Sequence, residues 1–102
     1  MSCDLKIMSV ESLDICQDTQ WEFIDYATVN VMNLGGANAA LDLLSNALMR
    51  IPEQNDCELL GYDLYLFDKN WFKLHCNKSK LIENIATIVK NAKYDFIGIS
   101  KF

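Results

Sequence analysis

The sequence has few residues that interrupt regular structure, and it lacks the apolar segments that direct a chain to a membrane. It has one Pro and four Gly in 102 residues, and it has no run of about 18 apolar residues. Its first residues also lack a cationic segment followed by an apolar stretch. These absences argue against a low-complexity chain, a spanning helix and a signal peptide, so we expect a cytoplasmic protein that binds no membrane.

The patterns that bind phosphate, dinucleotides or zinc are absent as well. Neither G-x-x-x-x-G-K-S/T nor G-x-G-x-x-G occurs, and there is no C-x-x-C pair. The four cysteines stand far apart, and we expect them to be reduced and mostly buried: Cys3, Cys16, Cys57 and Cys76. The sequence therefore predicts no cofactor and no metal ion.

Residues suited to acid–base or nucleophilic chemistry are scarce. His75 is the only histidine. On a strand its neighbour Cys76 would point to the opposite face, so a Cys57–His75 pair across a sheet is the arrangement that could activate a thiol. We expect no enzyme, and the alternative is a small enzyme or ligand-binding domain that uses Cys57, His75 or Cys76.

The composition is that of a globular chain, with 51% hydrophobic and 23% charged residues. Residues 5–10 are a short strand candidate. Thr19-Gln20-Trp21-Glu22 has the form of a capping box, and Phe23, Ile24 and Ala27 follow on one stripe, which predicts a helix over residues 20–33. The Thr, Val, Tyr and Trp content of this segment favours a long strand instead, and both interpretations stay open.

The middle of the chain shows helical spacing. Gly35 and Gly36 predict a helix end, because glycine adopts the left-handed cap conformation without a Cβ clash. Residues 37–51 then carry apolar side chains at helical spacing, and Pro52 ends that helix.

The second half begins with alternating apolar residues. They predict a hairpin with strands over 58–67 and 71–76 and a turn over 68–70. Ser79 then caps a last helix, and residues 95–100 form a terminal strand. The order β-αα-ββ-α-β predicts a single α+β domain over residues 1–102, with helices on one face of a mostly antiparallel sheet; the ferredoxin-like plan is one arrangement of this kind.

Charge is divided unevenly along the chain. The whole sequence has 14 acidic residues against nine Lys and Arg, a net charge of −5. Residues 1–68 contain twelve acidic and two basic residues (net −10), whereas residues 69–102 contain two acidic residues and seven lysines (net +5). A strongly acidic two-thirds argues against nucleic acid as a direct partner and favours a basic protein.

The acids around residue 20 form a row. In a helix, Asp18, Glu22 and Asp25 would share one face near its start, with Asp14 leading in. Acids in a first turn favour the helix dipole, but like charges four residues apart repel each other. A solvated face and a face for a basic partner therefore both stay open.

Aromatic residues lie near these acids. Trp21 and Tyr26 flank the row, and buried anchors of protein interfaces are rich in such residues. We assign the phenylalanines to the core, namely Phe23, Phe67 and Phe72. For Tyr65 and Trp71 both core and surface stay open.

The C-terminal part resembles a known family. Ile82-Glu83-Asn84-Ile85, followed by residues 92–101 (AKYDFIGISK), is similar to the closing helix and strand of immunity proteins for tRNA-cleaving colicins. The resemblance covers about a fifth of the chain. It implies a small, acidic, cytosolic bacterial protein that binds and blocks one nuclease toxin, as the immunity proteins of contact-dependent inhibition systems do. No binding residue of the family transfers, because the matched segment is scaffold.

Our hypothesis from the sequence is an immunity protein or antitoxin that docks on a basic toxin through acidic residues. The predicted toxin-binding residues are Asp14, Asp18, Glu22, Asp25 and Tyr26, with Glu53, Asp56, Asp63 and Tyr65 as a second patch. A phage-encoded inhibitor of a nucleic-acid-binding defence complex is an alternative with the same surface. An ordinary oligomeric subunit is another.

Overall fold

The computed structural model describes residues 2–16, 18–30, 36–52 and 63–101. Within these residues the chain forms five strands and three helices: β1 (Ser2–Val10), β2 (Trp21–Asn30), α1 (Gly36–Leu44), β3 (Met49–Ile51), β4 (Leu64–Asp68), α2 (Lys69–Leu74), α3 (Lys80–Ile88) and β5 (Phe96–Lys101). None of the helices in this part of the chain is long and apolar enough to cross a bilayer.

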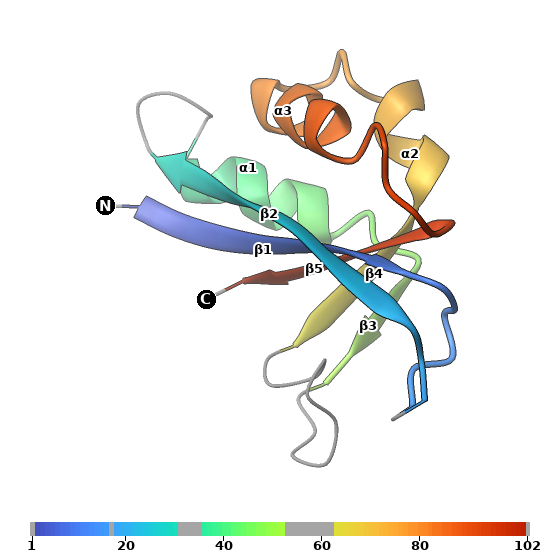
Figure 1. Cartoon of the computed structure of the whole chain (residues 1–102). Coiled ribbons are helices and arrows are strands. Elements are labelled where there is room, and N and C mark those ends of the chain that lie inside the picture. Colours follow the sequence, from blue (N-terminus) through green and yellow to red (C-terminus); the bar gives the residue numbers. More distant parts are fainter. Residues whose placement is uncertain (1, 17, 31–35, 53–62, 102) are drawn as a thin grey trace.

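All strand pairs of the sheet are antiparallel, and the strand order is β2-β1-β5-β4-β3. The terminal strands β1 and β5 are therefore neighbours near the middle, and β2 and β3 form the two edges. The three helices lie on the same side of this sheet (Figure 1). The α+β class with helices on one face of an antiparallel sheet is thus confirmed, although β2 directly follows β1, which departs from the ferredoxin-like order.

The main hydrophobic core lies between the sheet and the helices. Leu5 and Ile7 of β1 and Ile97 and Ile99 of β5 alternate toward this side, as the two-residue period of a strand requires. Phe72 of α2 is completely buried against them, and burial of such a side chain contributes roughly 2–3 kcal/mol. Phe67 is buried too, so the core assignment of both phenylalanines is confirmed.

The opposite face of the sheet carries a second, smaller core. Met8 and Val10 of β1 pack with Leu64 and Leu66 of β4, across β5. Gly98 makes this close approach possible, because a Cβ atom there would lie 3.0 Å from Leu64 Cδ1, 3.1 Å from Met8 Cγ and 3.2 Å from Val10 Cγ2. Any larger residue at position 98 would force these side chains apart.

The helix expected over residues 20–33 is wrong for the described part: residues 21–30 are strand β2, the alternative that the β-branched and aromatic content favoured, and residues 31–33 lie outside the described residues. The second misassignment is residues 71–76, expected as a strand. Helix α2 covers most of them, and Asp68 caps it by accepting a hydrogen bond from Asn70 N at 2.8 Å. The expected hairpin of 58–67 with 71–76 is therefore wrong, and residues 58–62 lie outside the described part.

The other elements agree with the sequence more closely. Residues 5–10 lie in β1, residues 96–100 lie in β5, and Ser79 caps α3 by accepting a hydrogen bond from Ile82 N at 3.2 Å. The helix expected over 37–51 is shorter, because α1 ends at Leu44 and residues 49–51 form β3. Gly36 begins this helix, which corrects its assignment as a helix end.

Candidate protein-docking edge

Strand β2 forms one edge of the sheet and is unusually long for an edge strand. It has ten residues, whereas strands average about five to six. Among the described residues it pairs only with β1, from Trp21 opposite Val10 to Asn30 opposite Ser2. Its outer side therefore presents backbone N–H and C=O groups that another chain could pair with.

A bulge in β2 sets which side chains this edge presents. Phe23 lies opposite Met8 and Asp25 lies opposite Ile7, so Ile24 is an extra residue with no partner on β1. In a regular strand residues three apart point to opposite faces, but the extra residue brings Phe23 and Tyr26 to the same face. Their ring centroids are 4.9 Å apart, and the two residues are 42% and 51% exposed.

The acidic side chains of β2 lie on the other face of the edge. Glu22 is opposite Ser9 and Asp25 is opposite Ile7, on the side of the sheet that carries the helices. Both are exposed, and Asp25 Oδ1 accepts a hydrogen bond from Tyr26 N at 2.8 Å. The edge thus combines aromatic rings on one face with carboxylates on the other.

The segment that leads into β2 is held in place by hydrogen bonds and apolar contacts. Glu11 and Gln20 close it, because Gln20 N donates to Glu11 Oε1 at 2.8 Å and Glu11 N donates to Gln20 O at 3.1 Å. Leu13 and Ile15 pack against the second core. The buried Thr19 Oγ1 accepts a hydrogen bond from Cys16 N at 2.8 Å and donates to the backbone oxygen of Asp14 at 3.3 Å.

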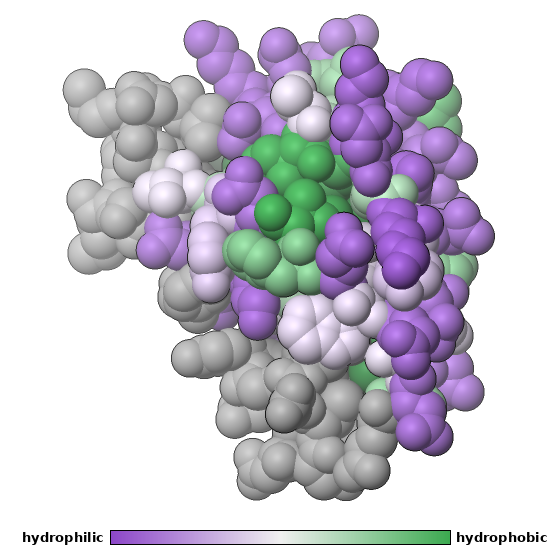
Figure 2. All heavy atoms as spheres, in the orientation of Figure 1, coloured by the Kyte–Doolittle hydropathy of each residue, from purple (hydrophilic) through white to green (hydrophobic). Residues whose placement is uncertain are grey.

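This segment exposes two further carboxylates, Asp14 and Asp18. Within the described residues the one ion pair joins Arg50 to Asp63. These two acids and the two of β2, Glu22 and Asp25, therefore form no ion pair with a described basic side chain. We call the exposed acids and rings on this side of the molecule the acidic edge: Asp14, Asp18, Glu22, Phe23, Asp25 and Tyr26. Figure 2, which views β2 from the front, also shows apolar atoms exposed between β2 and α3 with polar side chains around them.

Phe23 belongs to this surface, which corrects its assignment to the core. The signal in the sequence is the alternation Trp21-Glu22-Phe23, which places Phe23 on the same side as Trp21 if the segment is a strand. Trp21 is half-buried, and Lys6 Nζ lies 5.6 Å from the centre of its ring.

The second predicted patch does not join the acidic edge. Asp63 and Tyr65 lie at the β3–β4 side of the sheet, at the opposite end of the strand order from β2. Arg50 of β3 pairs with Asp63 and lies 6.0 Å from the Tyr65 ring. The hydrogen bond and the charge of Asp63 raise the pKa of Arg50. Glu53 and Asp56 lie outside the described residues.

The side chains considered for catalysis are not assembled. His75 caps the end of α2, where its ring lies 4.8 Å from that of Trp71, so the expected position on a sheet is wrong. Cys57 lies outside the described part. Cys76 is half-buried and Cys16 is exposed, which corrects the expectation of burial for Cys16. In the described ranges no three His, Cys, Asp or Glu side chains are grouped as metal ligands would be.

No protein-family model, curated protein or solved structure matches this chain.

Proposed function

We propose that this protein is an immunity protein or antitoxin that binds a basic nuclease toxin through the acidic edge. The observation that carries the proposal is the combination, on and next to edge strand β2, of four exposed carboxylates that form no ion pair within the described residues and the exposed Phe23–Tyr26 pair. The similarity of the C-terminal helix and strand to colicin immunity proteins supports the same class.

The physical basis is electrostatic complementarity. A nuclease needs a basic groove to hold its polyanionic substrate, and a protein that presents several carboxylates can occupy such a surface. The acids would raise the association rate, and salt would lower it because exposed charges are screened beyond about 8 Å at physiological ionic strength. The two rings would supply apolar contact that slows dissociation.

The test is co-expression with each neighbouring gene product, followed by co-purification and a measurement of whether the protein suppresses toxicity. With a partner in hand, Glu22→Lys/Asp25→Lys should slow association about tenfold or more at low salt. The matched control is Asp42→Lys/Glu83→Lys, which makes the same change of charge at exposed positions on α1 and α3. It should slow association less than about threefold, because it leaves the acidic edge intact.

Equal rates for the two double variants would show that only the total charge matters and would overturn the acidic edge as the binding site. A partner that is a nucleic-acid-binding defence complex rather than a toxin would replace the proposal with that of a phage inhibitor. Failure of every neighbouring gene product to bind, with no suppression of toxicity, would contradict the immunity function itself.

A further inference from the structure

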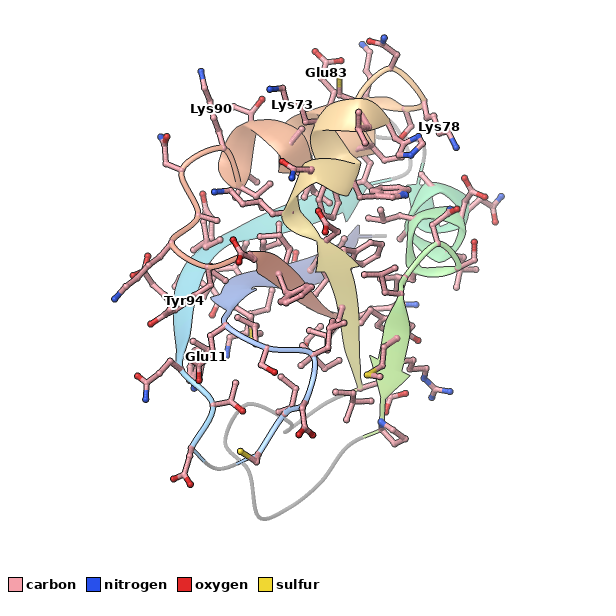
Figure 3. The ribbon with its side chains drawn as sticks, turned by 90° about the vertical axis from the view of Figure 1, so that its right-hand side faces the viewer. Glu11, Lys73, Lys78, Glu83, Lys90 and Tyr94 are labelled. Carbon is pink, nitrogen blue, oxygen red and sulfur yellow. The ribbon has the colours of Figure 1, made fainter. Side chains whose placement is uncertain are left out.

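A second feature, which shares no residue with the acidic edge, is a groove between α2 and α3. It has a volume of about 630 Å³, in the range of small-molecule sites. Its lining contains one carboxylate, that of Glu83, and three lysines: Lys69, Lys73 and Lys90. Figure 3 shows Lys73, Glu83 and Lys90 at the helical end of the molecule, well away from Glu11, which directly follows β1.

The three ammonium groups of the groove are not neutralised by the described part of the chain. Lys69 is held at the groove by donating from Nζ to the backbone oxygen of Ala92 at 2.8 Å, which is a neutral acceptor. An ammonium has three donors, so Lys69 keeps two for another molecule. Lys73 and Lys90 are exposed and form no ion pair in the described ranges. The groove thus has a surplus of positive charge in a protein whose total charge is −5.

The remaining lining residues suit a small organic molecule. The half-buried Ala86 supplies apolar surface, and Asn70 supplies an amide group that can donate hydrogen bonds. Three lysines against one glutamate leave about two positive charges, which match a phosphate monoester carrying about −1.5 to −2 at pH 7.

We propose that the α2–α3 groove binds a small phosphate monoester, with the phosphate among Lys69, Lys73 and Lys90 and the organic part against Ala86. A single-stranded nucleic acid suits the groove less well. Among the described residues no aromatic side chain lines it for bases to stack on, and the acidic remainder of the protein repels a long polyanion.

The first experiment is calorimetric titration of the intact protein at constant ionic strength with four probes. They are adenosine 5′-monophosphate, adenosine, inorganic phosphate and a single-stranded RNA of about ten nucleotides. Adenosine 5′-monophosphate should bind with a Kd of about 1 mM or lower, inorganic phosphate more weakly, and adenosine not measurably. Absence of saturable binding by both phosphate-bearing small probes, or tighter binding per site by the RNA, would overturn the proposal.

Three variants locate the site. Lys73→Gln/Lys90→Gln should weaken binding of adenosine 5′-monophosphate about tenfold, because it removes two of the three charges at the groove. Lys78→Gln/Lys101→Gln, which removes two exposed lysines outside the lining, should weaken it less than about twofold. Glu83→Gln should tighten it about two- to threefold, because a nearby carboxylate repels the phosphate. Equal losses in the two lysine variants, or no tightening in Glu83→Gln, would place the anion elsewhere.

Discussion

The β2 edge of the sheet is a strand of ten residues with exposed carboxylates and two exposed rings, whereas the β3 edge is a strand of three residues. Arg50 on the short edge is paired with Asp63, so its charge is compensated within the protein. On the long edge no carboxylate of the described residues is compensated in this way. Both edges leave backbone groups on their outer side within the described residues, but the long edge has more of them and adds exposed carboxylates and rings that another molecule could bind.

The two edges differ in the side chains that they present as well as in length, and the bulge in β2 causes this difference. It brings Phe23 and Tyr26 to one face and turns Ile24 toward the main core. Bulges and charged side chains also protect edge strands from uncontrolled pairing. The bulge and the charges, which generally protect edge strands, therefore also shape the surface that a specific partner would meet.

The two edges should differ most in how much the loss of their exposed apolar side chains weakens binding of the partner. Phe23→Ala/Tyr26→Ala should weaken binding of the partner about tenfold or more, mainly through faster dissociation, because aromatic anchors carry much of the energy of an interface. Leu48→Ala/Met49→Ala is the matched control at the β3 side, where the two residues are 60% and 44% exposed. It should change the dissociation rate less than about twofold in surface plasmon resonance. A larger loss of affinity in the control than in Phe23→Ala/Tyr26→Ala would show that the partner binds at the β3 edge.

The bulge also explains why the sequence predicts a helix where β2 lies. Ile24 and Ala27 both pack against the main core although they are three residues apart, which is the spacing of a helix. One extra residue in a strand converts the two-residue period into a three-residue one. The pattern alone cannot distinguish the two cases, and only the Thr, Val, Tyr and Trp content indicated a strand.

Helix α2 shows the opposite difficulty. Trp71 and Phe72 favour a strand by propensity, yet Asp68 caps a helix and the rings of Trp71 and His75, four residues apart, lie 4.8 Å from each other. The cap and this spacing are visible in the sequence, but the alternating apolar residues before them predicted a hairpin instead. The buried contacts of Phe72 with the main core, which stabilise this short helix, are set by tertiary structure.

The exposure of the four acids could be predicted from the sequence, but their relation to the second patch could not. Asp63 and Tyr65 lie toward the opposite edge of the sheet, because β1 and β5 lie between β2 and β4. Strand order depends on long-range pairing, for which a single sequence carries little signal. Pairing of Asp63 with Arg50, 13 residues away, is also a consequence of the β3–β4 register.

A smaller effect, on thermal stability, should follow from a substitution in the segment that leads into β2. This substitution tests whether hydrogen bonds hold that segment in place as part of the acidic edge. Thr19→Val removes the hydroxyl that accepts from Cys16 N and donates to Asp14 O, and the loss of these two part-buried hydrogen bonds should cost about 1–2 kcal/mol. The Tm in thermal denaturation should fall by about 5 °C or more. Ser12→Ala removes an exposed hydrogen bond to Asp14 N and should lower the Tm less. Equal Tm values for Thr19→Val and the unaltered protein would mean that the segment is not held by Thr19.

The smallest effect should come from the short edge, where Asp63→Asn removes the charge partner of Arg50. Both side chains are well exposed, at 58% and 37%, and solvent-exposed ion pairs contribute little to stability, so the Tm should change by no more than about 1 °C. Because Asp63 raises the pKa of Arg50, the Arg50 contribution is fully present below the pKa of an unfolded arginine and is lost only as the pH rises through the folded value. The Tm difference between Asp63→Asn and the unaltered protein should therefore stay constant from about pH 5 to 9. The association rate with the partner should change less than about twofold, and a change as large as that of Glu22→Lys/Asp25→Lys would show that both edges bind.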